Sequence, residues 1–313
     1  MTDLGCPMPD PQAIKIVGFV GLGQMGLPMA ARLAEAGYDV RGFDISQPAR
    51  AALRAKAPAA RAAGSLAEVA EDADAVVLML PDSKVIATVT RSHGLLAAMR
   101  RGALLIDMSS AEPAATAELA AEALGKDIRL VGAPVSGGVI GAAGGTLTIM
   151  AGGDAAAVTR ARPLLENLGS RVVHVGTHPG AGHALKALNN LISAIHMLAT
   201  SEAMLAGQRF GLDPAVMLDV INTSSGRSGS SQNKWPNYVL PGGYDSGFAM
   251  RLQVKDAMIG LGITREFGTG ARLAELAVEL WRQAANWLPD GADHIEIVRW
   301  LEQTREGPGD FTG

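Results

Sequence analysis

The sequence predicts an N-terminal α/β domain with a mainly parallel sheet, followed by an all-α domain. Its 313 residues are enough for about two domains of roughly 150 residues each. Short apolar runs alternate with amphipathic segments as far as about residue 178, which is typical of a parallel sheet covered by helices. After Gly180 this alternation stops and helical spacing prevails. We therefore expect a first domain over 13–178 and a second over 179–313, which begins with a long interdomain helix.

The expected elements can be placed in order along the chain. Residues 1–12 hold three prolines and no periodicity, so we expect a disordered tail there. Strands are expected near Ile16–Phe19, Val40–Asp44, Ala75–Leu80, Leu104–Met108, Arg129–Pro134, Leu147–Ala151 and Val172–Val175. The long helix should span about 180–208, with further helices at 213–221, 252–266, 271–285 and 293–302. Ser65 and Glu68 have capping-box spacing, and Gly37 is placed to end a helix.

Charge and cysteine content argue against several classes of protein. The chain carries 27 Lys and Arg against 31 Asp and Glu, a net charge of -4, so it offers no basic surface for nucleic acid or anionic lipid. Glycines and a proline interrupt the apolar run over 16–34, which argues against a membrane span. The single cysteine, Cys6, allows no intrachain disulfide and no thiolate zinc site, and it favours a cytoplasmic location.

A glycine-rich turn follows the first expected strand. Glycine makes up 38 of the 313 residues, and three of them stand in Gly21-Leu22-Gly23-Gln24-Met25-Gly26, just before a helical segment. The first glycine permits a tight turn, the second lets the backbone approach a pyrophosphate, and the third lets the helix pack on the strand. This context predicts a Rossmann-type dinucleotide-binding domain with these six residues at the cofactor. The alternative is a purely structural turn.

Asp44 lies at the end of the second expected strand, 18 residues after Gly26. A carboxylate there can accept both ribose hydroxyls of a dinucleotide and repels the 2′-phosphate of NADP, so the sequence favours NAD. Arg50 could assist NADP only if the loop folded back. Leu80 and Pro81 should lie at the same carboxyl edge of the sheet, although a proline there can also simply end a strand.

Two segments after later strands suit ligand contacts. Asp107-Met108-Ser109-Ser110 ends a strand with small hydroxyls, which fits either a ligand contact or an N-cap for the helix expected at Pro113. Farther along, Ser136 is followed by Gly137 and Gly138, and consecutive N–H groups beside a hydroxyl suit a substrate carboxylate. A flexible loop is the alternative for this second segment.

The long helix carries a polar stripe at spacings of three and four, which comprises Lys186, Asn189, Asn190, Ser193, His196 and Thr200. We expect the stripe to line an interdomain cleft, where a partly desolvated lysine can exchange a proton with substrate. From periodicity alone, a snorkelling surface lysine is the alternative. The histidines show neither an HExxH pattern nor cysteine partners, so no metal site is expected.

Together these motifs resemble those of the β-hydroxyacid dehydrogenases, the family that includes 3-hydroxyisobutyrate dehydrogenase, tartronate semialdehyde reductase and L-threonate dehydrogenase. The resemblance covers residues 14 to about 302. It rests on GLGQMG at 21–26, DMSS at 107–110, APVSGGVIGAAGGTLTIMAGG at 133–153, GAGHALKALNN at 180–190 and the pair Lys255-Asp256. It implies an NAD-dependent oxidoreductase that interconverts a small 3-hydroxy acid and its semialdehyde or keto acid by hydride transfer.

The resemblance also implies a role for each matched residue. Lys186 becomes the general acid/base, and Ser136 with Gly137 and Gly138 becomes the carboxylate site. Asn189 or Asn190 becomes an amide that orients the substrate. Ser110 and Lys255 become contacts on the nicotinamide side, with Ser110 also near the substrate.

Departures from the family's pattern bear on the substrate and on the alternatives. Ser224-Ser225-Gly226-Arg227 is similar to the SSGR of 3-hydroxyisobutyrate dehydrogenases, but Gly229 and Gln232 stand where those enzymes have tryptophan and aspartate. A polyhydroxy acid, such as L-threonate or tartronate semialdehyde, is therefore the alternative substrate. An imine reductase is less favoured because those enzymes generally replace Lys186, and a non-catalytic NAD-binding protein is a further alternative. The alanine- and leucine-rich helical domain predicts a homodimer or homotetramer.

Overall fold

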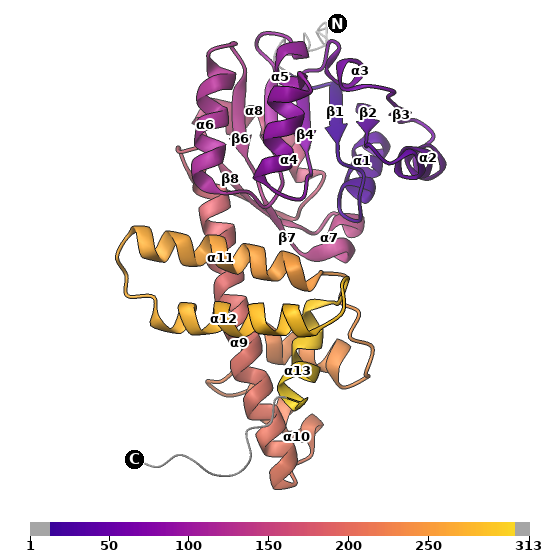
Figure 1. Cartoon of the computed structure of the whole chain (residues 1–313). Helices are drawn as coiled ribbons and strands as arrows, with labels where there is room; N and C mark the ends of the chain where they lie inside the picture. Colours follow the sequence, from indigo (N-terminus) through magenta and orange to yellow (C-terminus); the bar gives the residue numbers. More distant parts are fainter. Residues whose placement is uncertain (1–12, 304–313) are drawn as a thin grey trace, which may run out of the picture. The chain divides into compact units, whose positions relative to one another are not determined.

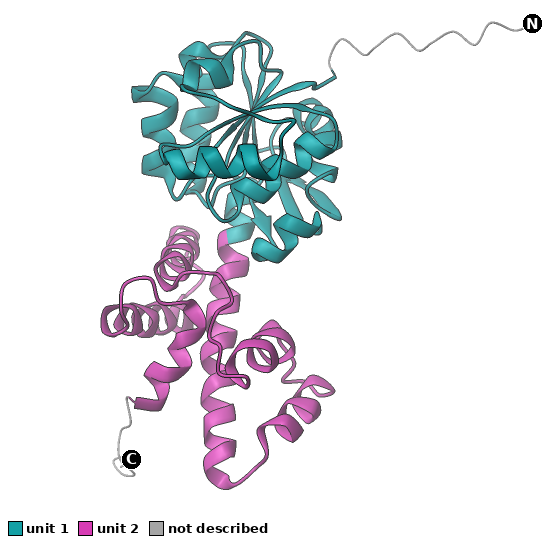
Figure 2. Ribbon diagram, turned by 90° about the vertical axis from the view of Figure 1, so that its right-hand side faces the viewer, with its two compact units in different colours: residues 1–186 teal, residues 187–313 magenta. Residues whose placement is uncertain are grey.

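The computed structural model describes residues 13–303, so the tail expected at 1–12 lies outside the described residues. The chain divides into two compact units between Lys186 and Ala187, inside helix α9 (Ala181–Phe210) (Figure 2). The first unit is α/β and the second is helical, which confirms the predicted fold class. None of the described helices is both long enough and apolar enough to span a bilayer.

A single sheet of nine strands forms the centre of the first unit, as far as the structure describes it. Six neighbouring strands in the order β3-β2-β1-β4-β5-β6 are parallel, the order of a doubly wound nucleotide-binding sheet. Strand β8 is antiparallel to β6 and β7 and parallel to β9. The strands are β1 (Ile16–Val20), β2 (Asp39–Phe43), β3 (Arg61–Ala62), β4 (Ala75–Leu78), β5 (Leu104–Asp107), β6 (Arg129–Gly132), β7 (Val135–Ser136), β8 (Thr148–Gly152) and β9 (Arg171–Gly176).

All seven expected strands are present, and β3 and β7 are additional. Each of these two has only two residues, and so short a segment cannot display an alternating pattern. Both exist because a neighbouring strand provides hydrogen-bonding partners, β2 for β3 and β8 for β7. Strand β7 contains Ser136, one of the expected substrate-binding residues.

Helices cover both faces of this sheet (Figures 1 and 2). Because successive side chains of a strand point to opposite faces, Val77 packs in one core with α1 and α8, whereas Val76 packs in the other with α3 and α6. The helices are α1 (Gly26–Glu35), α2 (Gln47–Lys56), α3 (Leu66–Ala70), α4 (Ser83–Ala87), α5 (Leu95–Ala98), α6 (Pro113–Leu124), α7 (Gly138–Gly144) and α8 (Ala155–Glu166), with a π-helical turn at Thr88–Ser92.

The expected helix ends are found, with one difference. Gly37 has a φ of 94°, as a glycine that ends α1 requires. Ser65 Oγ accepts the N–H of Glu68 at 3.2 Å and so caps α3. The Glu68 carboxylate, however, accepts the N–H of Gly64 rather than that of Ser65, so the capping box is displaced by one residue.

The second unit contains the rest of α9 together with α10 (Pro214–Asn222), α11 (Met250–Glu266), α12 (Arg272–Trp287), a 3₁₀ turn (His294–Glu296) and α13 (Ile297–Gln303). Helices α11 and α12 lie side by side (Figure 1). At 30 residues, α9 is about 45 Å long. A π-helix over Ser230–Val239 was not expected, because Pro236 and its polar neighbours are typical of loops. Burial of Trp235, whose indole N–H donates to Ser201 Oγ at 3.1 Å, holds it in place.

Candidate active site

The glycine-rich turn between β1 and α1 leaves room for a ligand at one position. A Cβ atom added to Gly21 would overlap the carbonyl oxygen of Met79, and one added to Gly26 would overlap that of Gly21. These two glycines are therefore required by the fold itself. Gly23 is exposed, and no atom of residues 13–303 lies within 4 Å of an added Cβ. Nothing in the packing requires a glycine there, and the open space suits the close approach of a pyrophosphate.

Asp44 is held directly beside this turn. Its Oδ2 accepts the main-chain N–H of Leu22 at 2.8 Å, and its Oδ1 accepts the N–H of Ser46 at 2.8 Å. The loop also folds back, because Arg50 donates to the Asp44 carbonyl oxygen at 2.5 Å and its guanidinium lies over the Phe43 ring, 5.5 Å from the centroid. The turn and the carboxylate thus form one preformed surface that fits a dinucleotide. Because the loop is folded back, the condition stated above for Arg50 to assist the binding of NADP is met.

The segment after β5 is joined to the loop after β4 at the carboxyl edge of the sheet. The buried hydroxyl of Ser109 accepts the main-chain N–H of Leu80 at 3.0 Å, so the loops after β4 and β5 lie together. The alternative that this segment caps α6 is wrong, because the N-cap residue is Glu112 and it makes no side-chain cap. Ser109 is buried and bonded to protein, whereas Ser110 is half-buried at the surface of this edge.

The Ser136 loop has the backbone geometry expected of an anion site. Ser136 pairs with Thr148 in the short β7–β8 ladder, and Gly137 and Gly138 follow with φ values of 137° and 63°. Such positive values favour glycine. Both glycines are exposed, and an added Cβ at Gly138 would have no neighbour within 4 Å. Like Gly23, Gly138 keeps a stretch of backbone open to a ligand.

Helix α9 begins tightly packed on the same sheet. A Cβ on Gly182 would overlap the carbonyl oxygen of Met150 in β8 and lie 2.6 Å from that of Gly132 in β6. One turn farther along α9, Lys186 is half-buried. The lysine is therefore on the part of the helix that contacts the strands next to the Ser136 loop. This packing within the first unit fixes the position of Lys186 relative to the sheet.

In the second unit, the buried carboxylate of Asp256 is connected to three of the expected site residues, Asn189, Asn190 and Lys255. Asp256 Oδ2 accepts the Asn190 side-chain amide at 2.6 Å, and Asp256 Oδ1 lies 3.2 Å from Lys255 Nζ. Asn189 in turn donates its side-chain amide to Asn190 Oδ1 at 3.2 Å. Gln253 fixes the backbone by donating to the Asn190 carbonyl at 3.2 Å. Asp256 is only 2% exposed and orients the amide and the ammonium around it.

Besides Asp256, two buried residues of the first unit were not assigned a role from the sequence: Asp107 and His183, whose Oδ2 and Nε2 atoms lie 3.5 Å apart. Asp107 was noted only as part of its strand end, and Asp256 only as the second residue of a pair. His183 precedes Lys186 by one helical turn in the polar segment of α9, a spacing that could have drawn attention to it. The contacts that give these residues importance join distant parts of the chain, which no local pattern displays.

Two family profiles match this chain in succession. One, described as the NAD binding domain of 6-phosphogluconate dehydrogenase, matches residues 16–176. The other, described as NAD-binding of NADP-dependent 3-hydroxyisobutyrate dehydrogenase, matches residues 180–301. Together they extend from β1 to α13.

Individual relatives agree with these profiles. The chain is 38% identical to 2-(hydroxymethyl)glutarate dehydrogenase of Eubacterium barkeri over 93% of this chain and 96% of that protein. It is 40% identical to 3-hydroxyisobutyrate dehydrogenase of Pseudomonas aeruginosa over 85% and 90% of the two chains. Among solved structures, 3-hydroxyisobutyrate dehydrogenase of Mycobacterium tuberculosis with L-serine matches with a TM-score of 0.83 and 33% identity, over 92% and 99% of the two chains.

Proposed function

This chain belongs to the β-hydroxyacid dehydrogenase family and is an NAD-dependent 3-hydroxyacid dehydrogenase, and from this premise we propose that Lys186 is its general acid/base. We assign the substrate carboxylate to Ser136, Gly137 and Gly138. One observation carries the proposal: the turn of α9 that precedes Lys186 packs on β6 and β8, next to the strand that contains Ser136. A proton-transferring amine and an anion site thus belong to one compact part of the first unit.

The proposed cofactor residues of the first unit lie at the carboxyl edge of the sheet, and Lys255 of α11 is assigned from the family's motif. We propose that the dinucleotide is held by the turn Gly21, Leu22, Gly23, Gln24, Met25 and Gly26, by Asp44, by Leu80 and Pro81, and by Ser110 and Lys255. The open space at Gly23 and the fixed Asp44 carboxylate support this assignment. NAD is favoured over NADP because a carboxylate repels a 2′-phosphate, and Arg50 limits the strength of that preference.

In oxidation, the uncharged amine of Lys186 accepts the proton of the substrate hydroxyl. A nicotinamide bound at the cofactor residues would supply the hydride acceptor for the carbon that carries this hydroxyl. The Ser136 hydroxyl and the N–H groups of Gly137 and Gly138 hold the carboxylate, which fixes the distance from the reacting carbon to Lys186. Asn189 or Asn190 orients the substrate. In reduction, Lys186 returns the proton to the forming alkoxide.

The similar proteins suggest a substrate class. 3-Hydroxyisobutyrate, L-serine and 2-(hydroxymethyl)glutarate each carry a hydroxymethyl group on the carbon that bears a carboxylate. We propose that the substrate has this unit, a 3-hydroxypropionate with a substituent at C2. A polyhydroxy acid such as L-threonate is the alternative, because Gly229 stands where the 3-hydroxyisobutyrate pattern has the much larger tryptophan.

A comparison of kcat/KM values for NAD reduction tests this class. The substrates are 3-hydroxyisobutyrate, 2-(hydroxymethyl)glutarate, L-serine and L-threonate, each with NAD and with NADP. We expect the highest kcat/KM with one of the first three and NAD. A higher kcat/KM for L-threonate would replace the proposed class by its alternative.

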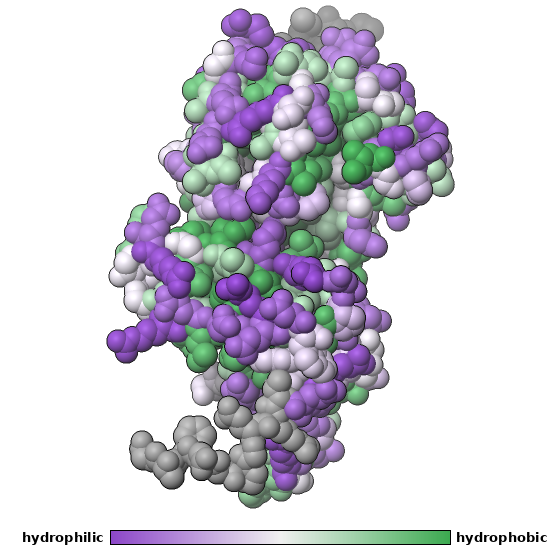
Figure 3. All heavy atoms as spheres, viewed as in Figure 1, coloured by the Kyte–Doolittle hydropathy of each residue, from purple (hydrophilic) through white to green (hydrophobic). Residues whose placement is uncertain are grey.

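We further propose that the chain forms a homodimer or homotetramer in the cytoplasm. Several large apolar side chains of the second unit are exposed, among them Phe210 (84%), Val216 (61%), Val220 (57%), Leu273 (62%) and Leu276 (57%). Figure 3 shows such green residues at the surface, between purple ones. Covering them with a second copy would remove apolar surface from water. Analytical ultracentrifugation that finds only monomer at micromolar concentration would contradict the proposal.

A further inference from the structure

Asp107 and His183 face each other in the interior of the first unit. Asp107 Oδ2 lies 3.5 Å from His183 Nε2, and the two side chains are 1% and 0% exposed. Burying a carboxylate is costly unless hydrogen bonds or an opposite charge compensate for the lost water. Asp107 obtains one such bond at Oδ1, from the N–H of Ser109 at 3.0 Å. The imidazole of His183 is the group that faces its other oxygen.

Glycines at three points permit this approach of α9 to the sheet. An added Cβ on Gly132 would lie 2.9 Å from His183 Cδ2 and 3.0 Å from its Nε2. Gly180 and Gly182 allow equally close contacts with the carbonyl oxygens of Pro113 and Gly132, both at 2.6 Å from an added Cβ. A side chain at any of these positions would push the start of α9 outwards. The pair therefore forms where the helix is pressed most closely on the sheet.

The pair is the end of a polar connection whose first two links are hydrogen bonds and whose last link is the 3.5 Å approach of Asp107 to His183. The Leu80 N–H donates to Ser109 Oγ at 3.0 Å, the Ser109 N–H donates to Asp107 Oδ1, and Asp107 Oδ2 faces His183. At one end, Leu80 belongs to the loop assigned to the cofactor. At the other end, His183 is one turn before Lys186 on α9. The connection thus runs from the cofactor edge of the sheet to the helical turn that precedes the proposed acid/base.

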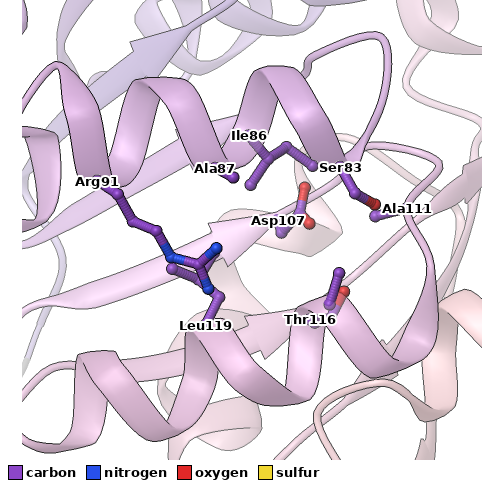
Figure 4. Close-up of a pocket in the computed structure, with 9 residues that line it drawn as sticks. Ser83, Ile86, Ala87, Arg91, Asp107, Ala111, Thr116 and Leu119 are labelled. Carbon is purple, nitrogen blue, oxygen red and sulfur yellow. The ribbon is translucent and has the colours of Figure 1, made fainter.

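Asp107 also lines a small cavity between α4 and α6, which Figure 4 shows beside Ile86, Ala111 and Thr116. The cavity measures about 20 Å³, room for a single water molecule and too little for a hydroxy acid. Asp107 itself is only 1% exposed, so its neighbours are protein groups. Its role must be exerted through its protein partners.

We infer that Asp107 and His183 are positioning residues that hold the Lys186 turn of α9 at a fixed place relative to the cofactor edge. The inference rests on the proposed role of Lys186. Neither residue touches the reacting atoms. Their contact sets where the amine stands, and small displacements of an acid/base group have large effects on rate.

A double-mutant cycle tests the inference. We expect Asp107→Ala and His183→Ala each to lower kcat by about 100-fold, with the Kd for NAD and the KM for the hydroxy acid nearly unchanged. The double variant should lose no more than either single variant, because both remove the same contact. The deuterium isotope effect on kcat should rise with substrate labelled at the reacting carbon. Independent, additive losses or an unchanged isotope effect would overturn the inference.

Two further variants separate positioning from general destabilisation. His183→Gln keeps a polar group that can reach Asp107, whereas the shorter His183→Asn does not, so we expect kcat to be about tenfold higher for glutamine. Equal kcat values would overturn the inference even if the alanine variants do not fold. Leu165→Ala, a buried residue of α8 outside the connection, should lower the melting temperature and leave kcat unchanged.

The inference and the proposed function fail in different ways. If Lys186→Ala retains turnover, the proposed acid/base role is wrong, and the inference falls with it. If Lys186→Ala abolishes turnover while Asp107→Ala and His183→Ala keep the wild-type kcat, only the positioning role is wrong. If the loss of kcat in the Asp107 and His183 variants only parallels their loss of melting temperature, the effect is general destabilisation, and this outcome also counts against positioning. Leu165→Ala provides the comparison, because it lowers the melting temperature without changing the connection.

Discussion

The carboxylate of Asp44 accepts a hydrogen bond from the main-chain N–H of Leu22, 2.8 Å away. Leu22 lies inside the glycine-rich turn, and Asp44 follows the neighbouring strand β2. The bond orients the acid toward the turn before any cofactor binds. Two parts of the proposed dinucleotide site are therefore joined by a hydrogen bond, and their role can be tested by substitution.

Asp44→Ala should narrow the preference for NAD over NADP. The substitution removes the acceptor for the ribose hydroxyls and the charge that repels a 2′-phosphate, so the ratio of kcat/KM values for NAD and NADP should fall by about tenfold or more. Arg50→Gln should change the ratio in the opposite direction, because it removes the cation beside Asp44. Steady-state kinetics with both cofactors measure the ratio. A wild-type protein that prefers NADP would refute the role of Asp44.

Gly23→Ala and Gly26→Ala form a matched pair. The added methyl group at Gly23 has open space, so the melting temperature should stay the same while the Kd for NAD rises about tenfold, or ~1.4 kcal/mol. At Gly26 the methyl group overlaps the Gly21 carbonyl and should lower the free energy of unfolding by about 1–3 kcal/mol. Calorimetric titration and thermal unfolding separate the two effects. Unchanged NAD affinity in Gly23→Ala would argue against a cofactor at this turn.

Lys186→Ala should abolish turnover and leave NAD binding nearly intact. General acid/base groups contribute roughly 10²–10⁴-fold to rate, and the loss of kcat should fall in that range or beyond. Stopped-flow measurement of NADH formation gives kcat, and fluorescence titration gives the Kd for NADH. Glu166→Gln, an exposed substitution at the end of α8, is a control that should change neither value. Turnover retained at the wild-type level would eliminate the assigned role.

His294 should make the second unit less stable in mild acid. Burial lowers the pKa of its imidazole, and the nearby Lys234 charge lowers it further, although a hydrogen bond with Asp293 opposes the change. A folded-state pKa below the unfolded value near 6.5 means that the unfolded chain binds the extra proton first. The free energy of unfolding should therefore fall as pH decreases from about 7 to 5, by at most ~1.4 kcal/mol per pH unit. Urea unfolding followed by tryptophan fluorescence measures this slope.

His294→Asn provides the control for this slope. The asparagine does not titrate, so the pH dependence between about pH 7 and 5 should become flatter, even though the packing of the ring on Phe248 and Trp281 is lost. Asp293 acts in a different window. Burial raises the pKa of its carboxyl, but hydrogen bonds from His294, Ile295 and Ser246 outweigh burial and lower it, so its contribution is lost only below about pH 4. An unchanged slope in His294→Asn would contradict the assignment.

The family-specific motifs and the positions of the longer strands along the chain were accessible from the sequence because they are local. A buried strand, a glycine turn and a helix each show a pattern within a short stretch of sequence, and so does the polar stripe that includes Lys186. The same local reading missed β7, since two residues show no period. It also left open whether Ser109 caps a helix or contacts a ligand. The structure turns its hydroxyl inward to the Leu80 N–H instead.

By itself, the sequence determined the class of protein and its fold class, and it predicted the dinucleotide turn, the acid at Asp44 and the role of Lys186. Tertiary structure alone decided three contacts between residues. Arg50 donates to the carbonyl oxygen of Asp44, and Asp256 binds the Asn190 amide and pairs with Lys255. Asp107 lies beside His183. The physical reason is that periodicity reports the environment of each residue along its own element. A contact between elements depends on how closely their backbones approach, and here glycines such as Gly132 and Gly182 set that distance.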